Sequence, residues 1–211
     1  MRYRCGRSGQ ANAAPTIDDG RTVRNIFGPA YGCCLRLLLI EAGQLGEYLA
    51  GMALFNGFTV MVCNPREEHR GAWTTPGVTL THEMPDDAVI ALRGDQRTAI
   101  VALTHEPKLD DLALLEALES ETFYVGAIGS RRNQAARRAR LIEHFGQTEQ
   151  SLARLRGPIG IHIDSKTPAE IAVSVMAELI AVKNGVVLPE GASVGIAKER
   201  LAVLPDCASA C

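Results

Sequence analysis

The first strong pattern in the chain is a pair of apolar runs separated by a segment of helical spacing. Residues 35–40 and 58–63 are apolar almost throughout, which is typical of buried strands. Between them, apolar residues recur three and four positions apart, at Leu45, Leu49 and Met52. We therefore predict a strand, a helix and a second strand, which together form a parallel βαβ unit.

The same alternation continues along the chain. Further strands are expected at three segments: 78–81, 99–104 and 123–128. Further helices are expected at a turn after Pro85 and at 110–119, 131–145, 149–155 and 168–182. Thr167 is placed to cap the last of these, with Pro168 at its first position. We therefore expect an α/β fold with a doubly wound parallel sheet, whose ligand site lies beyond the carboxyl ends of the strands.

Both ends of the chain differ from this pattern. Residues 1–33 and 186–211 are rich in small, polar and turn-forming types. We expect both segments to be poorly ordered, which leaves one domain at residues 34–185. A chain of 211 residues with 46% hydrophobic content is able to bury a core of that size.

Charge and composition exclude several functional classes. The net charge is −2, so the chain has no overall basic excess of the kind that binds nucleic acid. No stretch approaches the roughly 18 to 20 consecutive apolar residues of a membrane helix, and the N-terminus has no signal-peptide core. The six cysteines include no Cys-x-x-Cys pair, so neither a metal site nor a disulfide framework is indicated. We expect a cytoplasmic protein with reduced thiols.

One segment carries the pattern of an anion-binding turn. The strand expected at 123–128 is followed by a turn with Gly126 and Gly129, and Ser130 is placed to cap the helix that Arg131 and Arg132 open. Free backbone N–H groups, the positive end of the helix dipole and two guanidinium groups then surround one point. That combination suits a phosphate.

Three further arginines lie on the same expected helix. Arg137, Arg138 and Arg140 are interpreted as a solvated helix face, because runs of charge usually have that role. The anion-binding role is therefore assigned to Arg131 and Arg132 alone.

Three other segments accompany the glycine-rich run at 123–132. Gly-Pro-Ile-Gly-Ile follows at 157–161 and Lys-Thr-Pro-Ala-Glu-Ile at 166–171, while Thr-His-Glu-Pro-Lys-Leu-Asp-Asp precedes it at 104–111. In their amino-acid sequence and in their order along the chain, these segments resemble the C-terminal Rossmann-type domain of the xanthine dehydrogenase accessory family, the XdhC/CoxI proteins. The resemblance covers residues 35–185. It implies a Rossmann-like fold in three layers and a role beside molybdenum hydroxylases.

Members of that family resemble two-part proteins. Their N-terminal domain holds a conserved cysteine associated with the molybdenum cofactor, and the nucleotide-binding-like domain follows it. Residues 1–31 of this chain are too few and too polar to build the first part. We therefore expect that most of that domain is missing, with residues 1–33 as its remnant, and that functions of that cysteine do not carry over.

The turn after the first strand is where a dinucleotide fingerprint is expected. Gly43 and Gly46 occupy its second and third glycine positions, but Glu41 replaces the glycine of the tight turn and would repel a pyrophosphate. The Asp-Pro-Arg of the family is replaced by Asn64-Pro65-Arg66, in which Asn64 and Arg66 suit a 2′-phosphate better than a carboxylate would. We expect NADP to be preferred over NAD if either binds. A turn that keeps its shape without dinucleotide affinity is the alternative.

The strand expected at 99–104 ends in residues with candidate chemistry. Thr104 and His105 lie where an open α/β sheet exposes functional groups, so both are candidate ligand contacts. His105 is also the candidate catalytic residue, because it could transfer a proton with Glu106 or Asp110 orienting it. Asp110 and Asp111 alternatively stabilise the dipole at the start of the next helix.

Three functions remain open. The resemblance implies a maturation factor that binds the molybdenum cofactor, or molybdopterin, and assists its sulfuration or insertion. Its partners would be a xanthine dehydrogenase-type enzyme and a cysteine desulfurase, and it would act as a chaperone rather than an enzyme. A NAD(P)-binding oxidoreductase is supported by the fold alone. A ligand-free interaction module or truncated copy is the third function. The apolar segment at 171–182 offers a homodimer interface.

Overall fold

The strands form one parallel sheet, as the sequence predicts. The computed structural model describes residues 34–40, 43–66, 73–104, 106–189 and 191–197. These residues form a six-stranded sheet in the order β3-β2-β1-β4-β5-β6, and every pairing is parallel. The strands are β1 (Leu35–Ile40), β2 (Phe58–Cys63), β3 (Thr79–Thr81), β4 (Thr98–Ala102), β5 (Tyr124–Ala127) and β6 (Leu155–Arg156). The expected doubly wound parallel sheet is confirmed.

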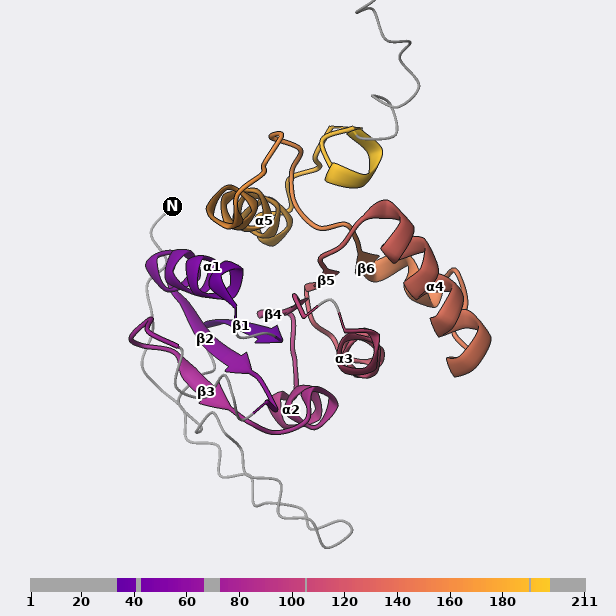
Figure 1. Cartoon of the computed structure of the whole chain (residues 1–211), viewed down its shortest axis with the longest axis horizontal. Helices are drawn as coiled ribbons and strands as arrows, with labels where there is room; N and C mark the ends of the chain where they lie inside the picture. The colour runs from indigo at the N-terminus through magenta and orange to yellow at the C-terminus, as the bar shows by residue number, and fades with distance from the viewer. Residues whose placement is uncertain (1–33, 41–42, 67–72, 105, 190, 198–211) are drawn as a thin grey trace, which may run out of the picture.

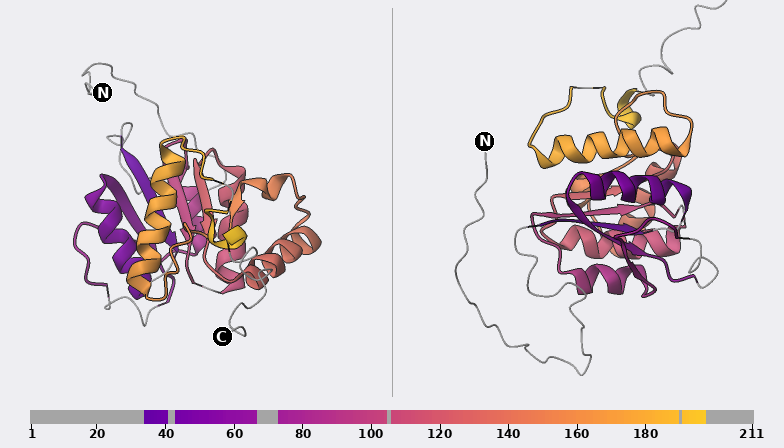
Figure 2. Two further views of the ribbon diagram at one scale, coloured as in Figure 1. Left: turned by 90° about the horizontal axis from the view of Figure 1, so that it is seen from above. Right: turned by 90° about the vertical axis from the view of Figure 1, so that its left-hand side faces the viewer.

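Helices cover both faces of this sheet and make three layers. They are α1 (Gln44–Phe55), α2 (Pro85–Leu92), α3 (Pro107–Glu119), α4 (Arg131–Phe145) and α5 (Pro168–Lys183). Figure 1 shows α1 and α5 side by side on one face, α2 and α3 on the other, and α4 beyond the β6 edge. The two further views of Figure 2 show the same layering from other sides. Since β1 pairs with β2 on one side and β4 on the other, the chain reverses its direction of winding at the β1/β4 boundary.

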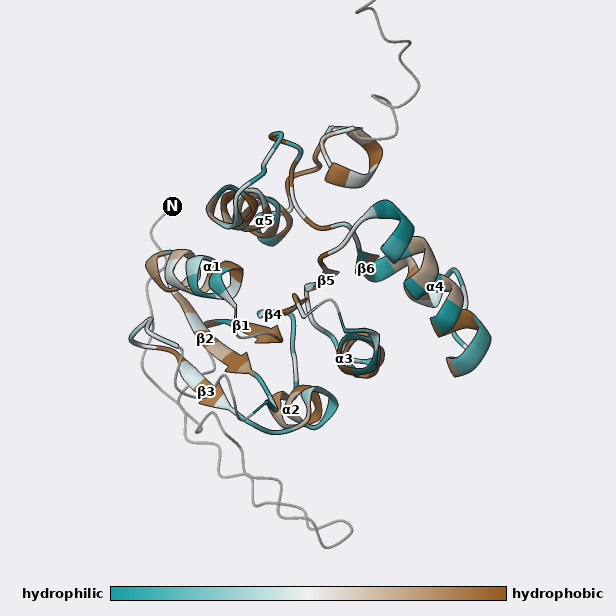
Figure 3. Ribbon diagram, viewed as in Figure 1, coloured by the Kyte–Doolittle hydropathy of each residue, from teal (hydrophilic) through white to brown (hydrophobic). Residues whose placement is uncertain are grey.

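Alternate residues of each central strand face opposite layers. Leu38 and Ile40 of β1 join the core beneath α2 and α3, whereas Leu37 and Leu39 join the core beneath α1 and α5. Both faces are therefore buried, which explains why the strands read as continuous apolar runs rather than as alternating ones. In Figure 3 the central strands are mainly hydrophobic, while α4 carries much of the hydrophilic surface.

Helix starts follow the capping chemistry that the sequence predicts. The Oγ of Ser130 accepts a hydrogen bond from Asn133 N at 3.1 Å and begins α4. Thr167 caps α5, and the side chain of Glu170 accepts from the backbone of Thr167 in return, which completes a capping box. Hydrogen bonds from Lys166 N and Thr167 N hold the pKa of the Glu170 carboxyl below its usual value.

Two segments differ from the prediction. The helix expected at 149–155 is wrong at its end, because a short 3₁₀ helix (Ser151–Arg154) is followed directly by β6. A strand of two residues has no periodicity to detect, so only its pairing with β5 identifies it. Helix α3 begins at Pro107, three residues before the predicted start, because proline is well suited to the first helical position.

The chain beyond α5 returns to the domain. His162 N donates to the carbonyl of Ala192 at 2.7 Å, and Val194 N donates to the carbonyl of Gly160 at 3.1 Å. Residues 191–197 therefore lie against the segment that follows β6. The sequence-based expectation for residues 1–33 lies outside the described residues.

Candidate functional site

The carboxyl ends of β1 and β4 lie next to each other where the winding reverses, which is the usual ligand position in such sheets. Gly43 is the N-cap of α1, and Gly46 is buried in its first turn. Thr104 follows β4 and donates its hydroxyl to Asp110 at 2.7 Å. Glu41 and His105, which carried the two sharpest expectations here, lie outside the described residues.

Arg66, from the second half of the expected dinucleotide fingerprint, forms an ion pair. The side chain of Asn64 accepts a hydrogen bond from Arg66 N at 2.9 Å, which closes the turn after β2. The guanidinium of Arg66 pairs with the carboxylate of Glu106, which follows β4. Because β1 lies between β2 and β4, this pair passes over the carboxyl end of β1. Arg66 is thus committed to a carboxylate, and its contact with a 2′-phosphate stays a prediction.

The start of α4 leaves hydrogen-bond donors free. The Ser130 side chain serves only the N–H of Asn133, and within the described residues the N–H groups of Arg131 and Arg132 have no acceptor. Gly129 adopts φ = 147°, a conformation that side chains rarely adopt, which lets the chain turn from β5 into the helix. Two free N–H groups therefore point outward at the positive end of the helix dipole.

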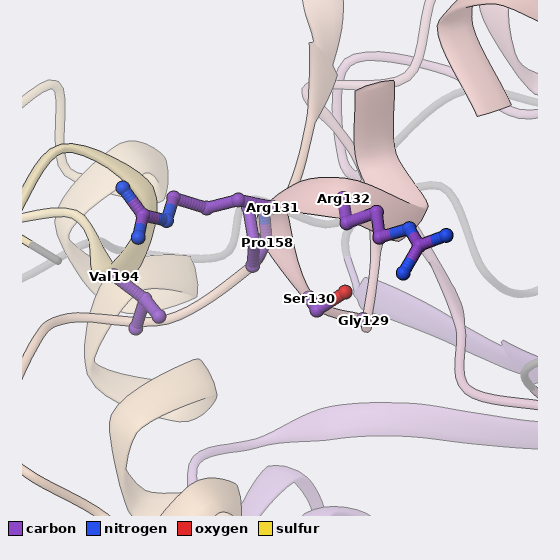
Figure 4. Close-up of a pocket in the computed structure, with 6 residues that line it drawn as sticks. All are labelled: Gly129, Ser130, Arg131, Arg132, Pro158 and Val194. Atoms are coloured by element: carbon purple, nitrogen blue, oxygen red, sulfur yellow. The ribbon is translucent and has the colours of Figure 1, made fainter. Parts of the chain in front are cut away.

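A cavity of about 440 Å³ opens at this helix start. Its walls are Gly129, Ser130, Arg131, Arg132, Pro158 and Val194. The two arginines are exposed and make no ion pair within the described chain. Figure 4 shows the Arg131 side chain extending toward Val194 and the Arg132 side chain extending to the opposite side. The guanidinium groups therefore flank the free N–H groups rather than converging on one point.

The cavity joins segments that are far apart in the sequence. Pro158 belongs to the motif at 157–161, so the structure brings that motif to the glycine-rich turn. Val194 was not predicted, because nothing in its local pattern distinguishes it. Only the pairing of residues 192–194 with residues 160–162 places it in this wall.

Gly126 lies apart from the cavity, inside β5. A Cβ built on it would lie 2.7 Å from both Ile159 Cγ2 and Tyr124 Cε1, closer than real side chains approach. The absence of a side chain is therefore required by packing in the sheet. A role for Gly126 in cofactor binding stays a prediction without a structural contact to support it.

The interpretation of three α4 arginines as a solvated face is wrong for Arg137, whereas Arg138 and Arg140 are partly exposed. Arg137 is only 4% exposed and lies with its Nη2 3.1 Å from Asp110 Oδ2 and its Nε 3.3 Å from Asp111 Oδ1. Arg140 also pairs with Asp111, at 2.8 Å, and Arg138 pairs with Glu149. Asp110 and Asp111 lie on α3 and Glu149 lies after the end of α4, so the charge run on α4 alone could not indicate these partners.

This ion-pair network connects the ends of two strands. Asp110 accepts from Thr104 after β4, while Arg137 Nη1 donates at 3.4 Å to the carbonyl of Ile128, next to Gly129. Burial raises the pKa of the Asp110 carboxyl, although the Thr104 hydroxyl and the Arg137 guanidinium act in the opposite direction. Asp110 and Asp111 are buried structural partners of arginines in addition to lying near the start of α3.

Cys63 is a buried thiol at the end of β2. Burial raises its pKa to about 12, and Glu83 and Asp86 add to the effect. It therefore behaves as a small apolar side chain. Within the described ranges no group of three or more acidic, histidine or cysteine side chains is placed to hold a metal ion. The helices of those ranges are all too short or too polar to cross a bilayer.

Several known proteins are similar to this chain in sequence or in fold. The family model of the XdhC Rossmann domain matches residues 37–179. The YqeB protein of Escherichia coli K12 is 34% identical over 181 residues, which are 85% of this chain and 33% of YqeB. The molybdenum cofactor insertion chaperone PaoD of the same organism is 33% identical over 89 residues, which are 42% of this chain and 28% of PaoD.

A solved structure agrees with these matches. The crystal structure of a xanthine dehydrogenase from Bacillus halodurans has a TM-score of 0.61 and 26% identity, and the match covers 72% of this chain and 43% of that one. This chain thus spans less than half of each of these three proteins. The residues matched by the family model include the strand-to-helix turn that leads into α4. This chain therefore belongs to the XdhC Rossmann domain family.

Proposed function

We propose that this protein is an accessory factor that binds the molybdenum cofactor and assists its sulfuration or insertion into a xanthine dehydrogenase-type molybdenum hydroxylase. Family membership supports the link to molybdoenzymes, and PaoD is named for cofactor insertion. The observation that carries the proposal is the cavity at the start of α4, with its free N–H groups and exposed arginines.

The residues of this cavity fit the phosphate of the cofactor's pterin. Backbone N–H groups at a helix start and guanidinium groups are the donors that proteins use for phosphate. The volume of about 440 Å³ lies in the range of small-molecule sites, about 300 to 1,000 Å³. Arg131 and Arg132 would hold the phosphate from two sides, with Ser130 keeping the helix start in place. The bound cofactor supplies the redox metal chemistry of the target enzyme.

The composition of the cavity supports holding rather than catalysis. Its described walls contain glycine, serine, proline, valine and two arginines, and none of these side chains exchanges a proton near neutral pH. Pro158 and Val194 give the cavity an apolar wall on one side. A chaperone that passes its ligand to a molybdenum hydroxylase needs these properties, and a cysteine desulfurase would be the sulfur-donating partner.

Direct binding of the cofactor tests this proposal. We expect freshly released molybdenum cofactor to bind the purified protein under anaerobic conditions and to bind the double variant Arg131→Ala, Arg132→Ala at least tenfold more weakly. Each charged contact to a phosphate contributes on the order of 1.5 to 3 kcal/mol, so a tenfold loss is a lower bound for two contacts.

A second double variant controls for the change in charge. Arg93→Asn with Lys183→Gln also removes two positive charges, but neither residue lines the cavity. We expect it to bind the cofactor as the unmodified protein does. Absence of binding by the unmodified protein would overturn the proposal in favour of a ligand-free interaction module. Equal binding by the arginine variant would place the cofactor elsewhere.

A further inference from the structure

A second cavity adjoins the first along α4. It has a volume of about 410 Å³ and lies between α4, β6 and residues 193–196. Arg131 and Pro158 line both cavities, so the two spaces share a wall at the start of the helix. A ligand anchored at the first cavity can therefore extend into the second.

Gln134 presents an unused donor to this second cavity. It is only 6% exposed, and its Oε1 accepts a hydrogen bond from Arg137 Nη1 at 3.0 Å. Because a guanidinium only donates, this bond identifies which end of the amide is the oxygen. The Nε2 has no partner within the described chain, although Gln134 is a wall of the cavity. The Nε2 atom itself is not fully buried, so its N–H groups are accessible from the cavity, where a ligand can accept from them.

Gly157 makes room for this amide. A Cβ on Gly157 would lie 2.4 Å from both Cδ and Oε1 of Gln134 and 2.6 Å from its Nε2. The glycine of the motif at 157–161 therefore allows the Gln134 side chain to lie flat against the backbone. The sequence offered only a loop glycine at this position.

The remaining polar walls also present donors. Arg156 lines the cavity and pairs with Glu178 at 3.1 Å, with its guanidinium 5.8 Å above the ring centre of Tyr124. The carboxylate of Glu178 is buried and already accepts from Arg156, the Tyr124 hydroxyl and Gly160 N. The acceptor is thus occupied, whereas guanidinium and amide N–H groups face the space.

Apolar groups complete the cavity. Ala135, Pro158 and Ile196 line it beside these donors. Apolar walls with a few donors at one side suit a planar ring that has hydrogen-bond acceptors along one edge. Phosphate alone would use neither the apolar walls nor the depth of this space.

We propose that this second cavity holds an oxo-substituted pterin ring and reads its carbonyl edge through Gln134 Nε2. The proposal rests on the function proposed above and orients the ligand, with the phosphate at the start of α4 and the heterocycle along the helix. If the ring had an amino group in place of this carbonyl, the N–H groups of the ligand would face the N–H groups of the cavity, and no hydrogen bond would form between them. Discrimination should therefore follow the exocyclic group rather than the ring itself.

Two fluorescent probes test this orientation. 6-Hydroxymethylpterin has an oxo group at ring position 4, and 2,4-diamino-6-(hydroxymethyl)pteridine has an amino group there. We expect the protein to bind the oxo compound about tenfold more tightly, measured by fluorescence titration. In Gln134→Glu the carboxylate still accepts from Arg137 but replaces the donor with an acceptor, so the preference should disappear or reverse.

Gln150→Glu is the matched control. Gln150 is exposed and lines neither cavity, so the same charge change there should keep the tenfold preference. Urea unfolding of Gln134→Glu shows whether the variant is folded. If it is not, Gly157→Ala provides the second variant, since its Cβ displaces the amide and should also remove the preference.

The outcomes separate this inference from the function proposed above. Three outcomes would each overturn the proposed pterin-ring site. The unmodified protein could fail to bind either probe up to the solubility limit of the probe, or it could bind both probes equally. The third outcome is an unchanged preference in a folded Gln134→Glu variant. Cofactor binding that depends on Arg131 and Arg132 would then still stand. Pterin discrimination without any cofactor binding would instead retain the site and overturn the function.

Discussion

Arg137 shows at the scale of one residue how partners from another element decide the role of a side chain. On sequence it is one of five arginines in ten positions, and all could be solvated. The fold brings Asp110 and Asp111 of α3 to it and leaves Arg137 only 4% exposed. A buried ion pair costs desolvation when it forms, but removal of one partner leaves an uncompensated charge.

We expect Arg137→Met to destabilise the protein by about 3 to 5 kcal/mol, measured by urea unfolding at neutral pH. The reason is that Asp110 stays buried without its cation, while Asp111 keeps only its pair with Arg140. Arg138→Met on the same helix is the control, because Arg138 pairs with the exposed Glu149 and such pairs contribute about 1 kcal/mol or less. Equal losses in the two variants would show that burial does not distinguish these arginines.

The same variant should show a pH dependence. The folded pKa of Asp110 lies above its unfolded value, so the folded state binds more protons and stability decreases as pH rises through that interval. Removal of Arg137 takes away an influence that lowers this pKa and widens the interval. The destabilisation by Arg137→Met should therefore be smaller near pH 4 than near pH 7. A constant difference between urea curves at the two pH values would contradict this.

At the scale of elements, local chemistry determined most of the boundaries. The helix predicted at 131–145 has those bounds in the structure, because a serine cap starts it and Gly146, with φ = 65°, ends it. Strand β6 is the exception, since two residues carry no period and only pairing defines them. Within β5, Gly126 is required by its neighbours across the sheet surface rather than by any turn.

Gly126→Ala should therefore destabilise the protein by about 1 to 3 kcal/mol, because its Cβ would overpack against Ile159 and Tyr124. Gly51→Ala is the control, since Gly51 lies inside α1 with nothing within 4 Å of the added Cβ. That substitution should be neutral or stabilise by about 0.5 to 1 kcal/mol. Thermal unfolding of both variants makes the comparison, and a neutral Gly126→Ala would show that the strand relaxes around the methyl group.

At the scale of the whole molecule, the candidate site is assembled from three segments. The turn at 129–132, Pro158 and Val194 form one cavity only because the chain after α5 returns to residues 160–162. These segments are separated by more than twenty residues each, and their meeting is a property of the tertiary fold.

We expect Val194→Glu to weaken binding of the molybdenum cofactor at least tenfold while the free energy of unfolding changes little. A carboxylate in that wall would face the phosphate, and two like charges about 4 Å apart repel by about 4 kcal/mol at an effective dielectric constant near 20. Val187→Glu adds the same charge at a side chain that is 91% exposed and should leave binding unchanged. Isothermal titration calorimetry of both variants measures their affinity for the cofactor. Unimpaired binding by Val194→Glu would show that residue 194 is not part of the site.

The sequence by itself determined the α/β class, the parallel sheet, the capped start of α4 and the family, because apolar periodicity, capping residues and short motifs are local signals. Only the tertiary structure decided that Arg137 is buried, that Arg66 pairs with Glu106, and that Gln134 and Val194 line cavities. Each of these depends on a partner from a distant segment. Burial and electrostatic pairing depend on distances in space. The hydrophobic pattern predicts only which face of each helix or strand is buried, and it does not predict which residues of other elements lie against that face.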